Sequence, residues 1–226
     1  VYALLLPALC MNMWPEDTRR GTAERLLTLP LTLPQLAITR FAVVWGLVGV
    51  FLLGTWPLVA AVAWLGNPDW GQLAAGYVGA FVLGGVLVAV TLLVGSMVNH
   101  GVVAFVVGLA VLVMLLLSGW GWVLDSLAGV LPAALVASLR EVSLREHYRR
   151  FTMGMVDMRS VAYFAALLLM ALALHIAVVQ RKTQRGFARR WAVGGVIVGI
   201  VLAMGGGYLP VRWDWTYEGQ FTLSPA

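Results

Sequence analysis

Charged residues are scarce in this chain of 226 residues. Asp, Glu, Lys and Arg make up 11% of it, whereas hydrophobic residues make up 61%, and the mean hydropathy is +0.90. A soluble globular domain carries about 25% charged residues, so this composition excludes that class. The composition indicates an integral membrane protein.

Cysteine and catalytic motifs are also nearly absent. Cys10 is the single cysteine, so no internal disulfide can form. The sequence has no Gly-rich phosphate loop with its lysine and no paired carboxylates inside an apolar run. Only His147 and Asp157 offer themselves as metal ligands in the one polar loop, and a metal site needs three or four. We expect no catalytic residue, no metal and no cofactor bound by this chain.

Long apolar runs fill most of the sequence. A run of about 20 residues crosses the ~30 Å hydrocarbon core of a bilayer, and it must be helical because its backbone groups need internal partners. Residues 1–13 are apolar but too short, so we expect the chain to begin inside a helix. The predicted fold is an all-α, polytopic helical membrane protein with about six spans, the first of them partial. The complete spans are expected at residues 36–65, 71–98, 101–123, 160–180 and 192–210.

Basic residues predict the orientation of these spans. The connection 181–190 contains five of them and no acid, which is typical of a cytoplasmic loop. Counting back four spans returns residues 14–35 to the same side, and leaves residues 124–159 and 211–226 extracytoplasmic. We expect a multi-pass protein of the bacterial inner membrane. Five arginines then fall outside against the rule, although long loops obey it less well; they are Arg140, Arg145, Arg149, Arg150 and Arg159.

The net charge of +5 does not require a nucleic-acid partner. Basic residues near the ends of spans are what topology and anionic headgroups favour. No interleaving of basic and aromatic residues forms a nucleic-acid platform. We therefore expect the lipid bilayer, and no nucleic acid, among the partners.

A charged segment follows the first, partial span. Pro15 suits a first helical turn, and Glu16 and Asp17 favour its positive end. Four leucines then supply an apolar side before Pro34, so the segment can lie along the membrane surface. On composition alone it is either an interfacial connector or a docking surface for an aqueous partner.

A resemblance favours docking. The run Glu24-Arg25-Leu26-Leu27-Thr28-Leu29-Pro30, preceded by Arg20-Gly21-Thr22, resembles the signature after the second transmembrane helix of ABC-2 type permeases. In that family this segment docks on the ATP-binding cassette subunit. The resemblance implies a separate cytoplasmic ATPase, which binds ATP and Mg, and a second permease subunit. It implies an ATPase-coupling role for Glu16, Arg19, Arg20, Gly21, Thr22, Glu24 and Arg25.

The predicted outer loop carries a second resemblance. Leu135, Val136, Leu139 and Val142 recur at helical spacing, which predicts an amphipathic helix at the outer interface. The residues after it resemble the gliding-motility class of ABC-2 permeases, although Met153 and Ser160 replace the Arg and Asp that are more usual there. The residues that match are His147, Tyr148, Phe151, Gly154, Asp157, Tyr163 and Phe164.

The tail resembles a different protein. Asp214 and Thr216, followed by Phe-Thr-Leu-Ser-Pro at 221–225, are similar to the start of the extracytoplasmic domain of the auxiliary gliding-motility-type transport protein. The resemblance implies two parts: residues 1–181 form an N-terminally incomplete permease domain, and residues 182–226 form the basic connection, a further span and the start of the auxiliary domain. We expect the chain to be a piece of a longer polypeptide.

A few polar and small residues inside the spans remain. His175 is ionisable and therefore a candidate for a substrate or proton role, but it also suits a bond to a neighbouring helix. Residues 99–101, Asn-His-Gly, predict a tight turn. A small-residue face predicts close helix packing or a pore lining; it contains Ala74, Ala75, Gly76, Gly79, Ala80, Gly84 and Gly85.

Together these features predict the transmembrane permease subunit of an ABC-2 type transporter, which couples ATP hydrolysis by a partner to export. The alternative is a mechanotransmission scaffold that moves an extracytoplasmic domain without passing a solute. A secondary transporter would place polar groups at mid-membrane and show inverted repeats, and the sequence shows neither.

Overall fold

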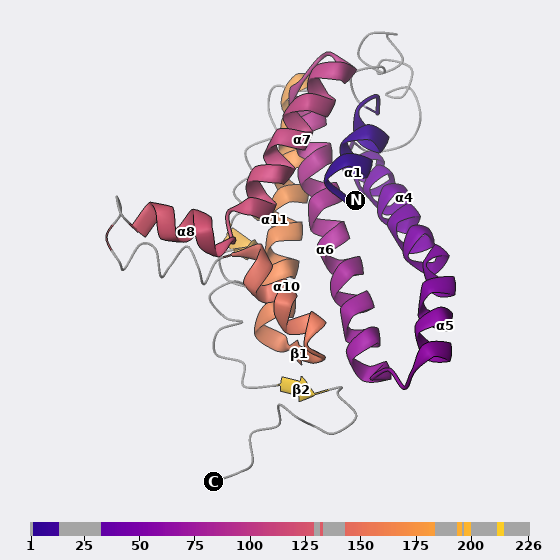
Figure 1. Ribbon diagram of the computed structural model, residues 1–226. Coiled ribbons are helices and arrows are strands. Elements are labelled where there is room, and N and C mark those ends of the chain that lie inside the picture. Colours follow the sequence, from indigo (N-terminus) through magenta and orange to yellow (C-terminus); the bar gives the residue numbers. More distant parts are fainter. Residues whose placement is uncertain are drawn as a thin grey trace.

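The structure is a computed structural model, and it describes residues 2–13, 33–128, 132, 143–183, 194–195, 197–199 and 212–214. Most of the chain that it describes is helical (Figure 1). The helices are α1 (Tyr2–Cys10), α4 (Leu33–Gly54), α5 (Trp56–Leu65), α6 (Trp70–Met97), α7 (Gly101–Leu117), α8 (Gly121–Ala128), α10 (Leu144–Thr152) and α11 (Met158–Thr183).

Helix α6 lies at the centre of the bundle. It packs against α1, α4, α7, α10 and α11, and its residues from Leu83 to Ala89 are buried on every side. Helices α4 and α7 bury a single stripe each. In α7, for example, only Ala104, Gly108 and Leu112 are buried, four residues apart, while much of its other surface is exposed and apolar. A helix that is apolar all round belongs to a core, and one-sided burial belongs to its outer layer.

Three helical stretches are long and apolar enough to cross a membrane: Leu33–Leu65, Trp70–Met97 and Met158–Lys182. They match the predicted spans 36–65, 71–98 and 160–180 to within one residue at Met97. The prediction of a continuous span over 101–123 is wrong, because α7 ends at Leu117. Most of the predicted span 192–210 lies outside the described residues. Helix α1, in the predicted partial span, has nine residues and is too short to cross a membrane.

The first long stretch is broken at Thr55. Pro57 lies in the first turn of α5, where it has no N–H to continue the hydrogen bonds of α4. Thr55 fills the break: its Oγ lies 2.6 Å from the carbonyl oxygen of Leu52 and 2.5 Å from the hydroxyl of Tyr77 on α6. The two helices therefore meet at a joint that is tied to the central helix.

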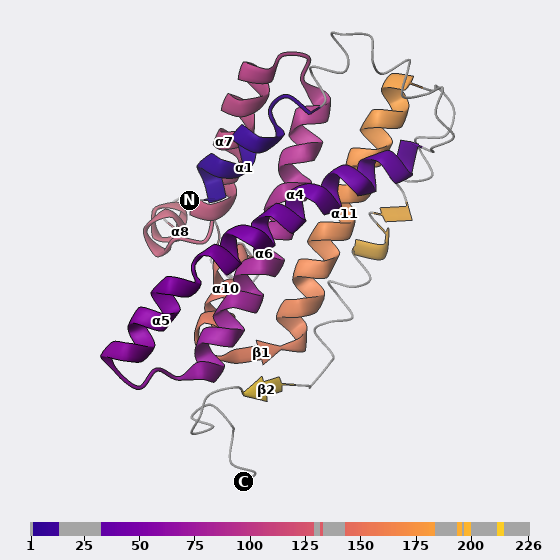
Figure 2. The same cartoon turned by 90° about the vertical axis from the view of Figure 1, so that its right-hand side faces the viewer.

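Helix α7 stops at a turn that contains two glycines. Trp120 N–H donates to the carbonyl of Leu117, and α8 then runs across the long axis of the bundle (Figures 1 and 2). A Cβ at Gly119 would overlap Ser143 and meet Arg145, so glycine is what allows this turn to touch the start of α10. Apolar residues continue past the break, and this continuity is why the sequence suggested one span.

The helix ends form two groups (Figure 2). Met13, Leu33, Asn99 and Lys182 lie at one end, where Arg40 donates to the carbonyl of Met13 and Lys182 donates to Asn99 Oδ1 over 3.0 Å. The predicted turn at residues 99–101 lies there as well, and α7 begins directly after it. We call this the Lys182 end.

The opposite end carries a small sheet. Strand β1 (Met155–Asp157) pairs antiparallel with β2 (Arg212–Asp214), with Val156 opposite Trp213. Each strand has three residues, so the described part of the chain is still mostly helical, as predicted. The pairing also brings three residues of the predicted auxiliary tail to the same end as the corner between α10 and α11.

Candidate functional site

Helix α10 and the start of α11 hold the residues of the predicted outer-loop motif. Most of α10 is polar, yet Leu144, His147 and Phe151 are buried. These positions are three and four residues apart, so they form one face of the helix. That face lies on α6 and on the first turns of α11. The helix is thus docked on the bundle. The segment 133–142, where the amphipathic helix was predicted, lies outside the described residues.

His147 is the centre of the buried face. Its Nδ1 lies 3.1 Å from Ser160 Oγ on α11, and its ring stacks on Tyr163 with the centroids 4.1 Å apart and the planes at 15°. Phe164 meets the same ring edge-on at 6.4 Å and is fully buried. Three members of the motif therefore form one contact cluster.

Asp157 organises the corner between β1 and α11. Its Oδ2 accepts a hydrogen bond of 2.7 Å from Arg150, and its Oδ1 accepts one of 3.1 Å from the backbone N–H of Arg159. The second bond caps the first turn of α11, where backbone N–H groups lack helical partners. One carboxylate thus joins the end of α10 to the beginning of α11.

Gly154 ends α10. Its φ is 82°, the left-handed region, and its N–H donates to the carbonyl of Phe151 over 3.0 Å. Glycine is favoured there because other residues bring Cβ too close to the following carbonyl. Six of the seven motif residues therefore have identifiable structural roles; the seventh, Tyr148, lines a pocket on another side of α10.

We expect Gly154→Ala to lower the free energy of unfolding by about 1 kcal/mol, because in the left-handed region the Cβ of alanine lies too close to the following carbonyl oxygen. Gly154→Asn is expected to cost less, since asparagine tolerates this region better than alanine. Unfolding of the purified protein in mixed dodecyl sulfate micelles measures both. Gly54→Ala is the control, because Gly54 ends a helix and no atom lies within 4 Å of a Cβ added there. Equal losses at Gly154 and Gly54 would contradict this role.

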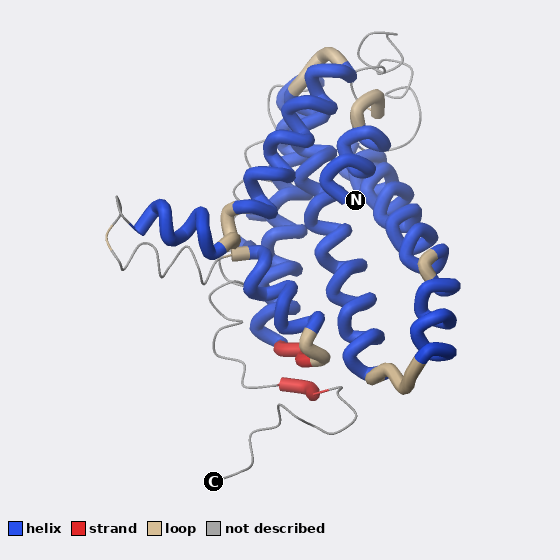
Figure 3. The backbone as a smooth tube through the Cα atoms, in the orientation of Figure 1, coloured by secondary structure: helices blue, strands red, loops and turns tan. Residues whose placement is uncertain are grey.

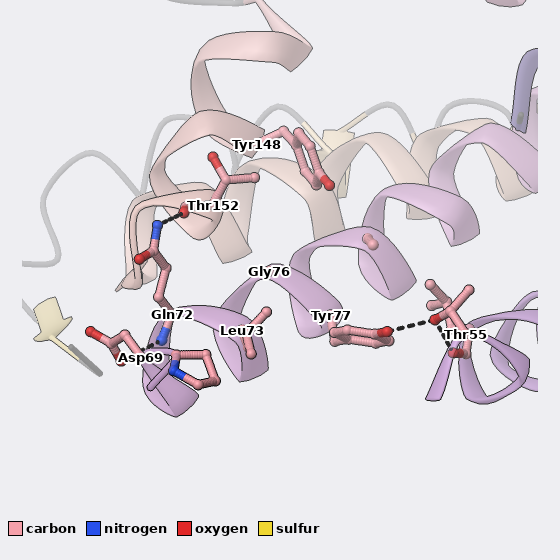
Figure 4. A pocket seen from close by; sticks show the side chains of 11 residues that line it. Thr55, Asp69, Gln72, Leu73, Gly76, Tyr77, Tyr148 and Thr152 are labelled. Carbon is pink, nitrogen blue, oxygen red and sulfur yellow. Dashed lines mark hydrogen bonds between the residues drawn. The ribbon is translucent and has the colours of Figure 1, made fainter. Parts of the chain in front are cut away.

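A pocket of about 660 Å³ lies beside α10, between α4, α6 and the loop before α6. We call it the outer pocket (Figure 4). Tyr148 and Thr152 of α10 line one side, and burial raises the pKa of the Tyr148 phenol. Gln72 Nε2 crosses from α6 to the Thr152 carbonyl over 2.8 Å.

The other walls of the outer pocket mix polar and apolar groups. Thr55 and Tyr77 bond to each other across it, and Asp69 accepts the N–H groups of Gly71 and Gln72 as the N-cap of α6. Hydroxyl, amide and apolar surfaces suit a molecule that is itself amphipathic. Among the described residues, no group of three or more His, Cys, Asp or Glu side chains is placed to hold a metal.

Three glycines of the small-residue face of α6 form helix contacts. A Cβ at Gly79 would lie 2.5 Å from Cβ of Phe151; one at Gly84 would meet Val48, and one at Gly85 would meet Trp45 and Leu168. These three positions confirm the packing prediction. Gly76 has nothing within 4 Å of such an atom and lines the outer pocket instead.

His175 is fully buried in α11. The residue does not line the outer pocket.

The sequence analysis missed two partners in the site. Ser160 bonds to His147, and Arg150 pairs with Asp157. The pair of Arg150 and Asp157 had a signal in the sequence: a basic helix end is followed by a glycine and an aspartate, directly before an apolar helix. The predicted coupling residues Glu16, Arg19, Arg20, Gly21, Thr22, Glu24 and Arg25 lie outside the described residues.

No family model, curated protein or solved structure matches this chain. The functional proposal therefore depends on the residues and on their arrangement.

Proposed function

We propose that this chain is the permease subunit of an ABC-2 type transporter of the bacterial inner membrane, driven by a separate cytoplasmic ATPase. The observation that carries the proposal is the segment 14–32 and its surroundings. Its sequence resembles the coupling element of that family, and its two flanks, Met13 and Leu33, emerge at the Lys182 end of the bundle together with the basic end of α11.

The residues on either side of this segment connect it to two helices of the bundle. Residue 13 follows α1, residue 33 begins α4, and Arg40 of α4 bonds to the backbone of Met13. Both helices pack on α6. A partner that binds the segment differently in two nucleotide states would shift the population of two arrangements of these helices. The outer pocket, which opens beside the joint at Thr55, is where such a shift would reach a cargo.

A specific observation also supports the alternative, a mechanotransmission scaffold. Strand β2 of the tail pairs directly with β1, which lies in the corner between α10 and α11. Movement of that corner would pass to the tail through backbone hydrogen bonds. In this alternative the same ATPase moves an extracytoplasmic domain, and no solute crosses the membrane.

Charge reversal in the coupling segment tests the docking that both functions share. We expect Arg20→Glu or Glu24→Arg to lower the membrane-stimulated ATPase activity of a co-expressed ATP-binding cassette subunit by about tenfold or more, because a like charge in an interface costs several kcal/mol. Co-purification of that subunit with the full-length chain is expected to fall with it.

The matched control is Asp125→Lys, a charge reversal at an exposed position of α8, away from the Lys182 end. Unchanged ATPase activity and co-purification in both segment variants would sink the coupling proposal. Transport into or out of vesicles whose protein lacks any extracytoplasmic domain would favour the permease over the scaffold.

A further inference from the structure

A second pocket lies on the other side of α10, where it meets α8 and the turn before it. Its volume is about 560 Å³. We call it the arginine pocket, because four arginines line it: Arg145, Arg149, Arg150 and Arg159. Tyr148 and Thr152 of the same helix face the outer pocket, so α10 separates a mixed cavity from a basic one.

Arginines outnumber acids among the described residues that line the arginine pocket: Glu146 is the one acid beside four arginines. Glu146 reaches Arg149 at 3.7 Å, but both side chains are partly in solvent, with exposed fractions of 39% and 59%. Such a pair is worth at most about 1 kcal/mol and leaves Arg149 available to another anion. Asp157, which does not line the pocket, pairs with Arg150. Arg145 and Arg149 therefore offer guanidinium groups to an anion that enters this concave site.

Guanidinium groups gathered in this way favour phosphate. Each is a planar fork of donors that matches two oxygens of a phosphate group. Arg145 is held in place by Trp120, whose ring lies 5.3 Å from its Cζ. A cation held over an aromatic ring loses less freedom when it binds a ligand.

The depth of the arginine pocket points to a lipid headgroup as the source of that phosphate. Helix α7 starts at the Lys182 end and has 17 residues, so it rises about 26 Å, which is close to the ~30 Å thickness of a hydrocarbon core. Its last turn and Trp120 therefore lie near the opposite boundary of the core. Trp120 and Trp122 are exposed there, and tryptophan favours the headgroup level.

We propose that the arginine pocket binds the phosphate of an acidic phospholipid headgroup in the leaflet that faces α8. Arg145 and Arg149, the two exposed arginines of α10, would grip the phosphate oxygens, while the acyl chains would lie along the apolar surface of α7. The proposal requires the membrane placement of the bundle but not its coupling to an ATPase.

Binding of a fluorescent short-chain phosphatidylglycerol to the purified full chain in neutral detergent tests this site. The same label on phosphatidylcholine provides the zwitterionic probe. We expect the wild-type chain to bind the phosphatidylglycerol at least about tenfold more tightly, because the arginines repel the choline cation that phosphatidylcholine carries beside its phosphate. Arg145→Gln with Arg149→Gln is expected to remove this preference.

Two further variants keep the test decisive. Arg181→Gln with Lys182→Gln removes the same charge at the other end of the bundle and is expected to leave the preference intact. Arg145→Lys with Arg149→Lys keeps the positive charge but not the planar guanidinium group. This variant is expected to retain part of the preference for phosphatidylglycerol. Circular dichroism and elution volume check that each variant is folded, and the lysine pair provides the readout if the glutamine pair does not fold.

Equal binding of the two probes by the wild-type chain would overturn the proposal, as would equal losses in the two neutralised double variants. Displacement of the probe by millimolar inorganic phosphate would overturn the lipid assignment in favour of a soluble phosphate anion. Failure of inorganic phosphate to displace it supports the headgroup.

Discussion

Gly79→Ala is expected to destabilise the protein by about 2 kcal/mol, within the range for overpacking of a well-packed contact. The added Cβ would lie 2.5 Å from Cβ and 2.8 Å from Cγ of Phe151. Phe151 is fully buried, and these atoms lie close to the backbone of α10, so they cannot swing aside. The whole of α10 must shift outward from α6. Unfolding in mixed dodecyl sulfate micelles measures the loss, and hydrogen exchange of the α10 amides measures the loosening.

Gly76→Ala is the matched control for this change. Gly76 belongs to the same helix, less than one turn before Gly79, but nothing lies within 4 Å of an added Cβ. Alanine in a helix interior is favoured over glycine by about 0.5 to 1 kcal/mol, so this variant is expected to be slightly more stable than the wild type. The two alanine substitutions should therefore have opposite signs. Equal changes in the free energy of unfolding, of the same sign, would show that α10 does not pack against Gly79.

Asp157→Asn is expected to cost about 2 kcal/mol. The carboxylate side chain is 7% exposed and its partner Arg150 is 25% exposed, so the change leaves a largely desolvated guanidinium without its counter-charge, and this situation costs up to about 3 to 5 kcal/mol when burial is complete. The asparagine oxygen can still cap the Arg159 N–H, which separates loss of the ion pair from loss of the cap. The free energy of unfolding measures the cost.

The neighbouring pair of Glu146 and Arg149 provides the control. Its atoms are 3.7 Å apart and its side chains are well exposed, so Glu146→Gln is expected to cost less than about 0.5 kcal/mol. Adding Arg150→Met to Asp157→Asn should recover part of the loss, because the unpaired charge is then gone. A loss at Glu146 as large as that at Asp157 would contradict the assignment of the corner to Asp157.

The sequence predicts the long helices well and their interruptions poorly. The runs over 71–98 and 160–180 are mostly apolar, and each corresponds to a single helix, α6 (Trp70–Met97) and α11 (Met158–Thr183). The run over 36–65 is equally apolar, but Pro57 removes one backbone donor and breaks it. A hydropathy average over about 20 residues does not reveal a break caused by a single proline. The break after Leu117 depends on the contact of Gly119 with Ser143 and Arg145, a contact between segments that no local pattern encodes.

The candidate site was predictable as a set of residues but not as a set of contacts. Residues 147 to 164 were singled out by order and type alone. The bond between His147 and Ser160 and the stacking of His147 on Tyr163 require the reversal at Gly154. The chain reverses at that glycine only when α10 packs against α6. Long-range packing therefore decides which polar residues meet.

The central position of α6 has a mechanical consequence. Helices α1, α4, α7, α10 and α11 all pack on α6, and neighbours among them also touch, as α1 does with α7 and α4 with α11. Helix α5 buries no residue of its own. A defect in α6 therefore disturbs five helix interfaces at once, whereas one in α5 stays local.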